Sequence, residues 1–222
     1  MARNLQPAVA VVLSLAALAS ANFSIVALGV LAPELQLEFG FSKAEVGFLI
    51  SLIFMGGALM SYPAGRLTDR VGPAVVLAWA LGLFAVAMLA ASVSSNIAVF
   101  LLLISLGGIA YGGVNPPTNV LVSWGRDRHI GFLLSLKQSG VPLGGIIAGI
   151  SLPPVVVTFG WRWGLASTAL SCMVVATATM LLRSKNSGKT LHSKGTSVRN
   201  RFSLARRELV ALGIFGFVMS GT

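Results

Sequence analysis

The chain has 222 residues and a formal net charge of +10, yet only 10% of its residues are charged and 55% are hydrophobic. Soluble domains carry about 25% charged residues, so this composition excludes an ordinary soluble globule and favours a protein that is solvated by lipid. The basic residues lie in short gaps between apolar runs and in one stretch from Arg183 to Arg207, a distribution that argues against nucleic acid as a partner.

The apolar runs predict an all-α membrane protein. Each complete run is long enough to cross a bilayer as a helix, and the runs are continuous rather than alternating, which counts against a β-barrel. They cover residues 8–32, 44–64, 74–94, 97–122, 130–157 and 163–182, and another apolar run opens near Glu208. We therefore expect a bundle of six transmembrane helices over residues 1–183 and the truncated start of a seventh helix over residues 208–222.

The beginning of the chain has two interpretations. Arg3, the apolar run after it and Ala19-Ser20-Ala21 together resemble a cleavable signal peptide. The apolar run continues past that point to Ala32, so an uncleaved first helix fits its length better.

Lysine and arginine residues predict the orientation. If the N-terminus is cytoplasmic, the outer loops hold only Lys43 and Arg162, Lys137 lies within the fifth span, and the other basic residues face inward. The sequence thus predicts a multi-pass protein of a bacterial inner membrane with a cytoplasmic N-terminus. Residues 184–207 are basic and rich in Ser, Gly and Lys, which indicates a cytoplasmic linker.

A glycine-flanked motif follows the second apolar run. Gly65 and Gly72 permit a tight turn and close helix approach, and Asp69 is expected near the N-terminus of the next helix, where a carboxylate is favourable. The segment Gly65–Gly72 resembles the G-x-L-x-D-R-x-G signature of the major facilitator superfamily. The resemblance implies that Asp69 latches the cytoplasmic side, with Arg70 or Arg66 as its partner. A helix cap within a positive-inside loop is the alternative.

The same resemblance implies the N-terminal half of a twelve-helix transporter. The sequence departs from the family pattern at Pro73-Ala74, where basic residues are usual, and at Ile104, where many proton-coupled relatives carry arginine. Pro142 is displaced from its place in the antiporter motif, so a drug/proton antiporter is the less favoured alternative. Residues 137–145, with the later Gly160–Trp163, look similar to cyanate-type permeases of small anions.

Polar residues recur within the predicted spans. Tyr111, Asn115 and Asn119 follow one another at four-residue intervals and are expected to form one stripe on the fourth helix. With Asn22 of the first span and Gln138 of the fifth, they are candidates for the lining of a substrate cavity. Hydrogen bonds between helices are the alternative for each of them.

Lys137 is the most informative single residue. It lies about seven residues into the fifth helix, or roughly 10 Å from its end. Gly140 and Gly144 share its helix face, and small residues mark helix contacts, so the lysine is expected to point into the bundle. The functional interpretation is an ammonium that binds an anion. The alternative is a lysine whose side chain extends to the cytoplasmic surface.

The sequence offers little for catalysis. Cys172 is the single cysteine, no histidine lies in a span, and neither paired intramembrane acids nor H-E-x-x-H occur. We therefore expect no enzyme activity, cofactor or metal. The predicted function is secondary active transport of a small solute, an organic or inorganic anion, by alternating access. Its expected partners are the bilayer, a coupling ion and a missing C-terminal half; the alternative is a non-transporting six-helix scaffold or truncated product.

Overall fold

Helices make up the part of the chain that the structure describes. The computed structural model describes residues 7–123 and 129–183. Within these ranges the helices are α1 (Pro7–Val30), α2 (Ala32–Phe39), α3 (Lys43–Val71), α4 (Pro73–Val93), α5 (Ile97–Tyr111), α6 (Asn115–Ser123), α7 (Ile130–Gln138), α8 (Gly140–Phe159) and α9 (Trp161–Arg183). Six stretches are long and apolar enough to cross a membrane: Ala8–Val30, Lys43–Val71, Pro73–Val93, Ile97–Ser123, Ile130–Phe159 and Trp161–Leu182. The predicted all-α, six-span architecture is confirmed. The expected linker and the start of a seventh helix lie outside the described residues.

The glycine-flanked motif is helical, and its prediction as a loop was wrong. Helix α3 continues through Gly65 to Val71, and the amide of Gly72 still donates to the carbonyl oxygen of Thr68 at 3.0 Å. Asp69 is therefore an exposed residue in the last turn of α3 rather than at the start of α4. Hydropathy marks where the lipid-facing run ends, but backbone hydrogen bonds carry the helix beyond that point into polar sequence.

Gly72 alone makes the turn between α3 and α4. Its φ of 98° and ψ of 148° lie in a region that is almost closed to residues with a Cβ. Gly65, by contrast, is helical, and a Cβ there would meet nothing within 4 Å. The two glycines of one motif thus have different structural roles.

Gly72→Ala is expected to destabilise the bundle by about 1–3 kcal/mol, because alanine cannot adopt this φ without strain. Gly65→Ala is the matched control, and it should leave the melting temperature unchanged or slightly raised because alanine favours a helix. Thermal unfolding of both variants in detergent tests this. Equal melting temperatures for the two would contradict the assignment of the turn to Gly72.

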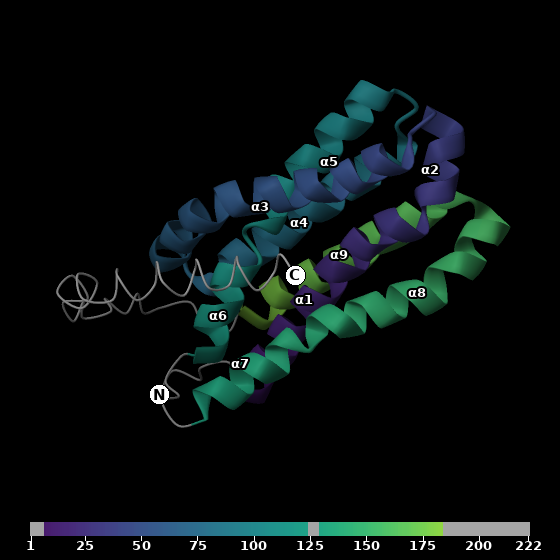
Figure 1. Cartoon of the computed structure of the whole chain (residues 1–222). Coiled ribbons are helices and arrows are strands. Elements are labelled where there is room, and N and C mark those ends of the chain that lie inside the picture. Colours follow the sequence, from purple (N-terminus) through teal and green to yellow (C-terminus); the bar gives the residue numbers. More distant parts are fainter. Residues whose placement is uncertain (1–6, 124–128, 184–222) are drawn as a thin grey trace, which may run out of the picture. The chain divides into compact units, whose positions relative to one another are not determined.

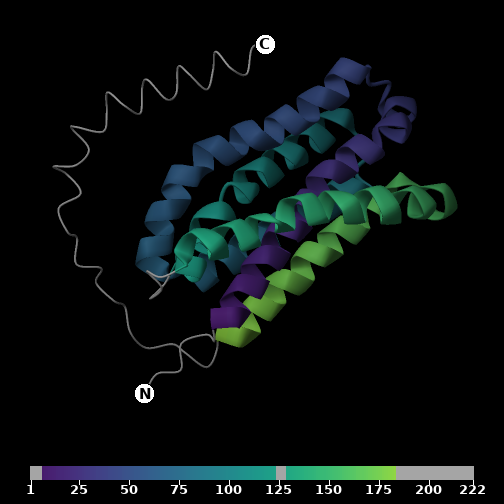
Figure 2. The same ribbon diagram turned by 60° about the horizontal axis from the view of Figure 1, so that its bottom comes forward.

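The helices pack through close backbone contacts. Helix α1 lies against α8 and α9, α3 lies along α5, and α4 packs on α9 and α5 (Figures 1 and 2). A Cβ added to Gly108 of α5 would lie 2.6 Å from the Cα of Ile53 in α3. Gly140 and Gly144 of α8 press similarly on the backbone of α1. Small residues at these crossings let neighbouring helices approach closely, as is usual in membranes.

Two spans are interrupted where prolines remove backbone donors. Pro116 and Pro117 have no amide hydrogen for the carbonyl oxygens one turn earlier, and the span breaks at residues 112–114 between α5 and α6. Within the break the hydrogen bonds tighten to a spacing of three residues, with the amide of Val114 donating to the carbonyl oxygen of Tyr111 at 3.0 Å. Pro142 likewise has no amide hydrogen to donate to the carbonyl oxygen of Gln138, and the fifth span breaks at Ser139 between α7 and α8.

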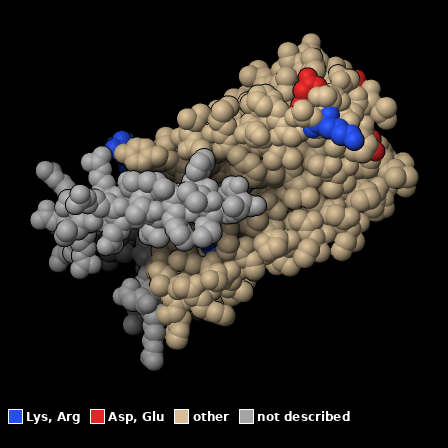
Figure 3. Space-filling model, viewed as in Figure 1, with Lys and Arg blue, Asp and Glu red and all other residues tan. Residues whose placement is uncertain are grey.

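Charged side chains gather at the two ends of the bundle. Where grey atoms do not cover the face that Figure 3 shows, the surface between these ends is almost entirely uncharged. At one end Arg162 of α9 pairs with Glu38 of α2, Nη2 to Oε1, at 2.9 Å. This distribution is the one expected of a bundle whose middle lies in hydrocarbon.

Candidate functional site

Lys137 is buried beside the break in the fifth span. It is the next-to-last residue of α7, and 2% of its surface is exposed. Its Nζ donates to Asn119 Oδ1 at 2.6 Å, to Thr118 Oγ1 at 3.0 Å and to Asn115 Oδ1 at 3.4 Å. The amine therefore lies among side chains of α6, and in this structure it does not extend to the surface.

Helix α6 supplies all three oxygens because it restarts after the break before Pro116 and Pro117. Asn115, Thr118 and Asn119 are spaced at i, i+3 and i+4, so they share one helix face. The hydroxyl of Thr118 also donates to the carbonyl oxygen of Asn115 at 2.8 Å. That bond fixes the hydroxyl so that its lone pairs face the lysine amine.

The charge of Lys137 has only neutral partners in the part of the chain that the structure describes. The one ion pair in residues 7–123 and 129–183 joins Arg162 to Glu38. Amide and hydroxyl oxygens solvate a buried ammonium but do not neutralise it. Asn115 and Asn119 are exposed rather than buried. The Lys137 ammonium is thus covered by α6, while two of its three partners, Asn115 and Asn119, are exposed at the surface of the bundle.

Three other residues predicted for the cavity are not among the hydrogen-bond partners of Lys137. Asn22 donates from Nδ2 to the carbonyl oxygen of Val141 at 2.7 Å and joins α1 to α8. The side chain of Gln138, at the end of α7, is exposed and has no hydrogen bond within the described ranges. The ring of Tyr111 packs against Phe54 and Phe84, with centroid distances of 6.0 and 6.1 Å. The break before α6 separates Tyr111 from the two asparagines, so the expected continuous stripe does not form.

Thr118 was missed by the sequence analysis, although it is fully buried and contacts Lys137. A threonine in a membrane helix usually bonds its own preceding turn, so the residue alone gives no signal. The available clue was its position three residues after Asn115 and one before Asn119, which places it on the same helix face as Asn115.

The motif at the end of α3 has no latch among residues 7–123 and 129–183. Neither Arg66 nor Arg70 forms an ion pair with Asp69 there. The guanidinium carbon of Arg66 instead lies 4.7 Å from the centre of the Tyr62 ring. A latching role for Asp69 therefore stays a prediction.

The described ranges hold no group of three or more His, Cys, Asp or Glu side chains placed to bind a metal ion. Cys172 is buried and lies 3.6 Å from the hydroxyl of Ser24, measured from Sγ to Oγ. The polar side chains that contact Lys137 are the candidate ligand-binding groups of this bundle.

Comparisons with known proteins agree on one family. The model of the Major Facilitator Superfamily matches residues 12–222. The 4-hydroxybenzoate transporter PcaK of Pseudomonas aeruginosa is 30% identical over 186 residues, which cover 83% of this chain and 40% of that protein. The gentisate transporter of Corynebacterium glutamicum is 29% identical over 144 residues, covering 64% and 32%. The niacin transporter NiaP of Acinetobacter baylyi is 30% identical over 126 residues, covering 56% and 29%. The likeness of residues 137–145 to cyanate-type permeases is not confirmed by these matches.

The fold also matches a solved transporter. The crystal structure of a peptide transporter, an E310Q mutant in complex with sulfate, superimposes with a TM-score of 0.68 at 16% identity over 94% of this chain and 45% of that one. At this identity the likeness concerns the fold alone. The chain spans less than half the length of the relatives named here.

Proposed function

The chain belongs to the major facilitator superfamily, and from this membership we propose that the protein carries a small organic anion across the membrane, with Lys137 contacting the acid group. The carrying observation is the buried amine, whose partners in the described ranges are all uncharged oxygens. A charge inside a membrane span is costly, and such residues ordinarily face a cavity or a partner. The carboxylate of a bound substrate would neutralise the positive charge of Lys137.

The names of the relatives favour an aromatic acid. Several of the related transporters are named for 4-hydroxybenzoate, gentisate, gallate and niacin, and another is named for hexuronate. All of them are transporters rather than enzymes. Each of these solutes combines a ring with a carboxyl group. We therefore take an aromatic carboxylate as the substrate class.

Transport by alternating access needs a second half. The aligned relatives are more than twice as long as the matched region, and in repeat-built transporters the substrate lies between the repeats. Asn115 and Asn119 are exposed in this bundle, as expected for groups that face such a cavity. In this proposal the N-terminus is cytoplasmic, because that orientation places most Lys and Arg residues inside.

A competition assay tests the proposal. Cells that produce the full-length protein are given labelled 4-hydroxybenzoate, with unlabelled benzoate or benzamide as competitor. Benzoate should compete at least about tenfold better than benzamide, because a hydrogen bond to a charged group contributes about 1.5–3 kcal/mol. Equal competition by the amide would contradict a role for the carboxylate charge.

Thr118→Val should weaken substrate binding without unfolding the protein. Valine has nearly the shape of threonine but removes the hydroxyl that orients Lys137, so the KM for uptake should rise by roughly three- to tenfold, corresponding to about 1 kcal/mol. Thr158→Val is the matched control, because that exposed hydroxyl bonds only to carbonyl oxygens of its own helix. If both variants keep the parental KM, Thr118 is not part of the site.

A further inference from the structure

An apolar groove is lined by side chains of three helices, α3, α4 and α5. Its volume is about 370 Å³. Its wall from Val76 to Ala90 on α4 extends for roughly 21 Å at the rise of an α-helix. Trp79, Leu83 and Leu106 line it and remain 58%, 64% and 48% exposed, so the groove opens outward along an apolar surface.

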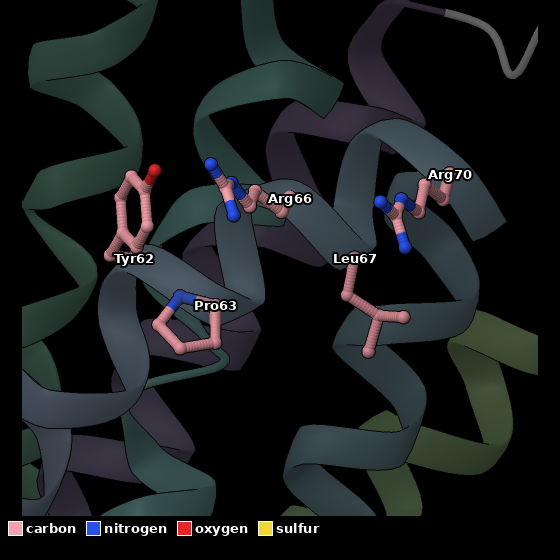
Figure 4. A pocket seen from close by; sticks show the side chains of 5 residues that line it. All are labelled: Tyr62, Pro63, Arg66, Leu67 and Arg70. Carbon is pink, nitrogen blue, oxygen red and sulfur yellow. The ribbon is translucent and has the colours of Figure 1, made fainter.

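A small basic pocket adjoins this groove at the end of α3. It is lined by Tyr62, Pro63, Arg66, Leu67 and Arg70, all from α3 (Figure 4). Leu67 lines both the pocket and the groove, so both border this side chain. Arg66 lies over the Tyr62 ring, and neither Arg66 nor Arg70 has an ion pair within the described ranges.

We propose that this pocket and groove together bind one anionic phospholipid, with its phosphate on Arg66 and Arg70 and an acyl chain along α4. The reason is charge complementarity at one end of an apolar channel. Two exposed guanidiniums offer paired donors suited to phosphate oxygens. A chain running from them along the groove would lie parallel to the helices, as acyl chains do in a bilayer.

The geometry favours a lipid over another occupant. The groove wall is longer than one leaflet of a hydrocarbon core about 30 Å thick. Arg66 and Arg70 lie near the C-terminal end of α3, which the positive-inside rule predicts to face the cytoplasm. Anionic lipids of that leaflet attract basic residues. An uncharged protein helix seated in the groove would leave these two charges without a counterion.

Native mass spectrometry of the full-length protein tests the proposal. The protein is reconstituted in nanodiscs that contain equal parts phosphatidylglycerol and phosphatidylethanolamine, and lipid that stays bound after release is identified. Phosphatidylglycerol should be retained over phosphatidylethanolamine. The double variant Arg66→Gln/Arg70→Gln should lower that retention by roughly tenfold, because each basic residue contributes to the attraction.

One further variant tests the contact with the acyl chain, and another is a control for the contact with the head group. Ala90→Phe, at a partly exposed position of the groove wall, should also reduce retention by filling the channel. Lys43→Gln removes an exposed cation at the other end of α3 and should change nothing. The proposal is overturned if the double arginine variant retains as much phosphatidylglycerol as the parent, or if the two lipids are retained equally. Unchanged retention of phosphatidylglycerol by Ala90→Phe would likewise exclude the groove as the binding site of the acyl chain.

Discussion

Lys137→Gln is expected to abolish uptake of aromatic carboxylates while the protein stays folded in the membrane. Glutamine keeps a donor for Asn119 Oδ1, which Lys137 contacts at 2.6 Å, but it removes the positive charge. Losing one member of a buried charge pair costs about 2–5 kcal/mol, so kcat/KM should fall by roughly 30- to several-thousand-fold. Initial uptake rates in cells, corrected for the amount of protein in the membrane, measure this loss.

The fold should tolerate this change. Burial of an ammonium opposes folding, and a neutral side chain of similar length removes that cost, so the melting temperature should stay constant or rise. Lys137→Arg keeps the charge but carries a wider head group, and it should retain part of the uptake. Full transport by Lys137→Gln would contradict the proposed role of the charge. A lowered melting temperature in both variants would instead assign Lys137 a structural role.

The transmembrane architecture was predictable because lipid leaves few alternatives. Backbone groups must be satisfied inside each span, so a continuous apolar run such as 74–94 could only become a helix, and it became α4. Helix ends were less predictable. The run 44–64 stops at the first polar residues, but α3 continues to Val71 because helical hydrogen bonds do not depend on lipid.

The candidate site was predictable in part. Lys137 is buried, as expected for a lysine that points into the bundle. The expectation was argued from a helix face shared with Gly140 and Gly144, but the break at Ser139 separates the lysine, which contacts α6, from these glycines, which contact α1. The partners depended on the break before α6, which turns Asn115 and Asn119 toward α7 and leaves Tyr111 among aromatic rings. Prolines mark places where a helix can be interrupted, but Pro63 lies inside the continuous α3 and Pro153 and Pro154 lie inside the continuous α8. Whether a break forms, and the direction of the next segment, follow from packing that local sequence does not encode.

The short segment from Lys137 to Gly144 contributes both to the candidate site and to the packing of the helices. Its first residue contacts α6, and its glycines press on α1. The Ser139 break lies between these contacts, so the position of the lysine depends on how closely α8 packs against α1. Damage to the glycine contact is therefore expected to disturb both the fold and the site.

Gly144→Leu should prevent normal assembly of the bundle. A Cβ at this position would lie 3.0 Å from the amide nitrogen of Phe23 and would overlap the carbonyl oxygen of Ala19, both backbone atoms of α1. Backbone cannot yield as a flexible side chain can, so the cost should reach or exceed the upper end of the usual 1–3 kcal/mol for overpacking, about 3 kcal/mol. We expect a large loss of monodisperse protein in size-exclusion chromatography and a melting temperature lowered by several degrees.

Gly149→Leu is the matched control because it makes the same substitution in the same helix. Gly149 is exposed, and a Cβ there would meet nothing within 4 Å, so leucine should face lipid without disturbing a neighbour. Gly144→Ala should be intermediate, since one methyl group already meets α1. If Gly144→Leu and Gly149→Leu purify and melt alike, α8 does not contact α1 at Gly144 in the membrane. If only Gly144→Leu fails, the close approach of α8 to α1 is required for the fold that holds Lys137 beside α6.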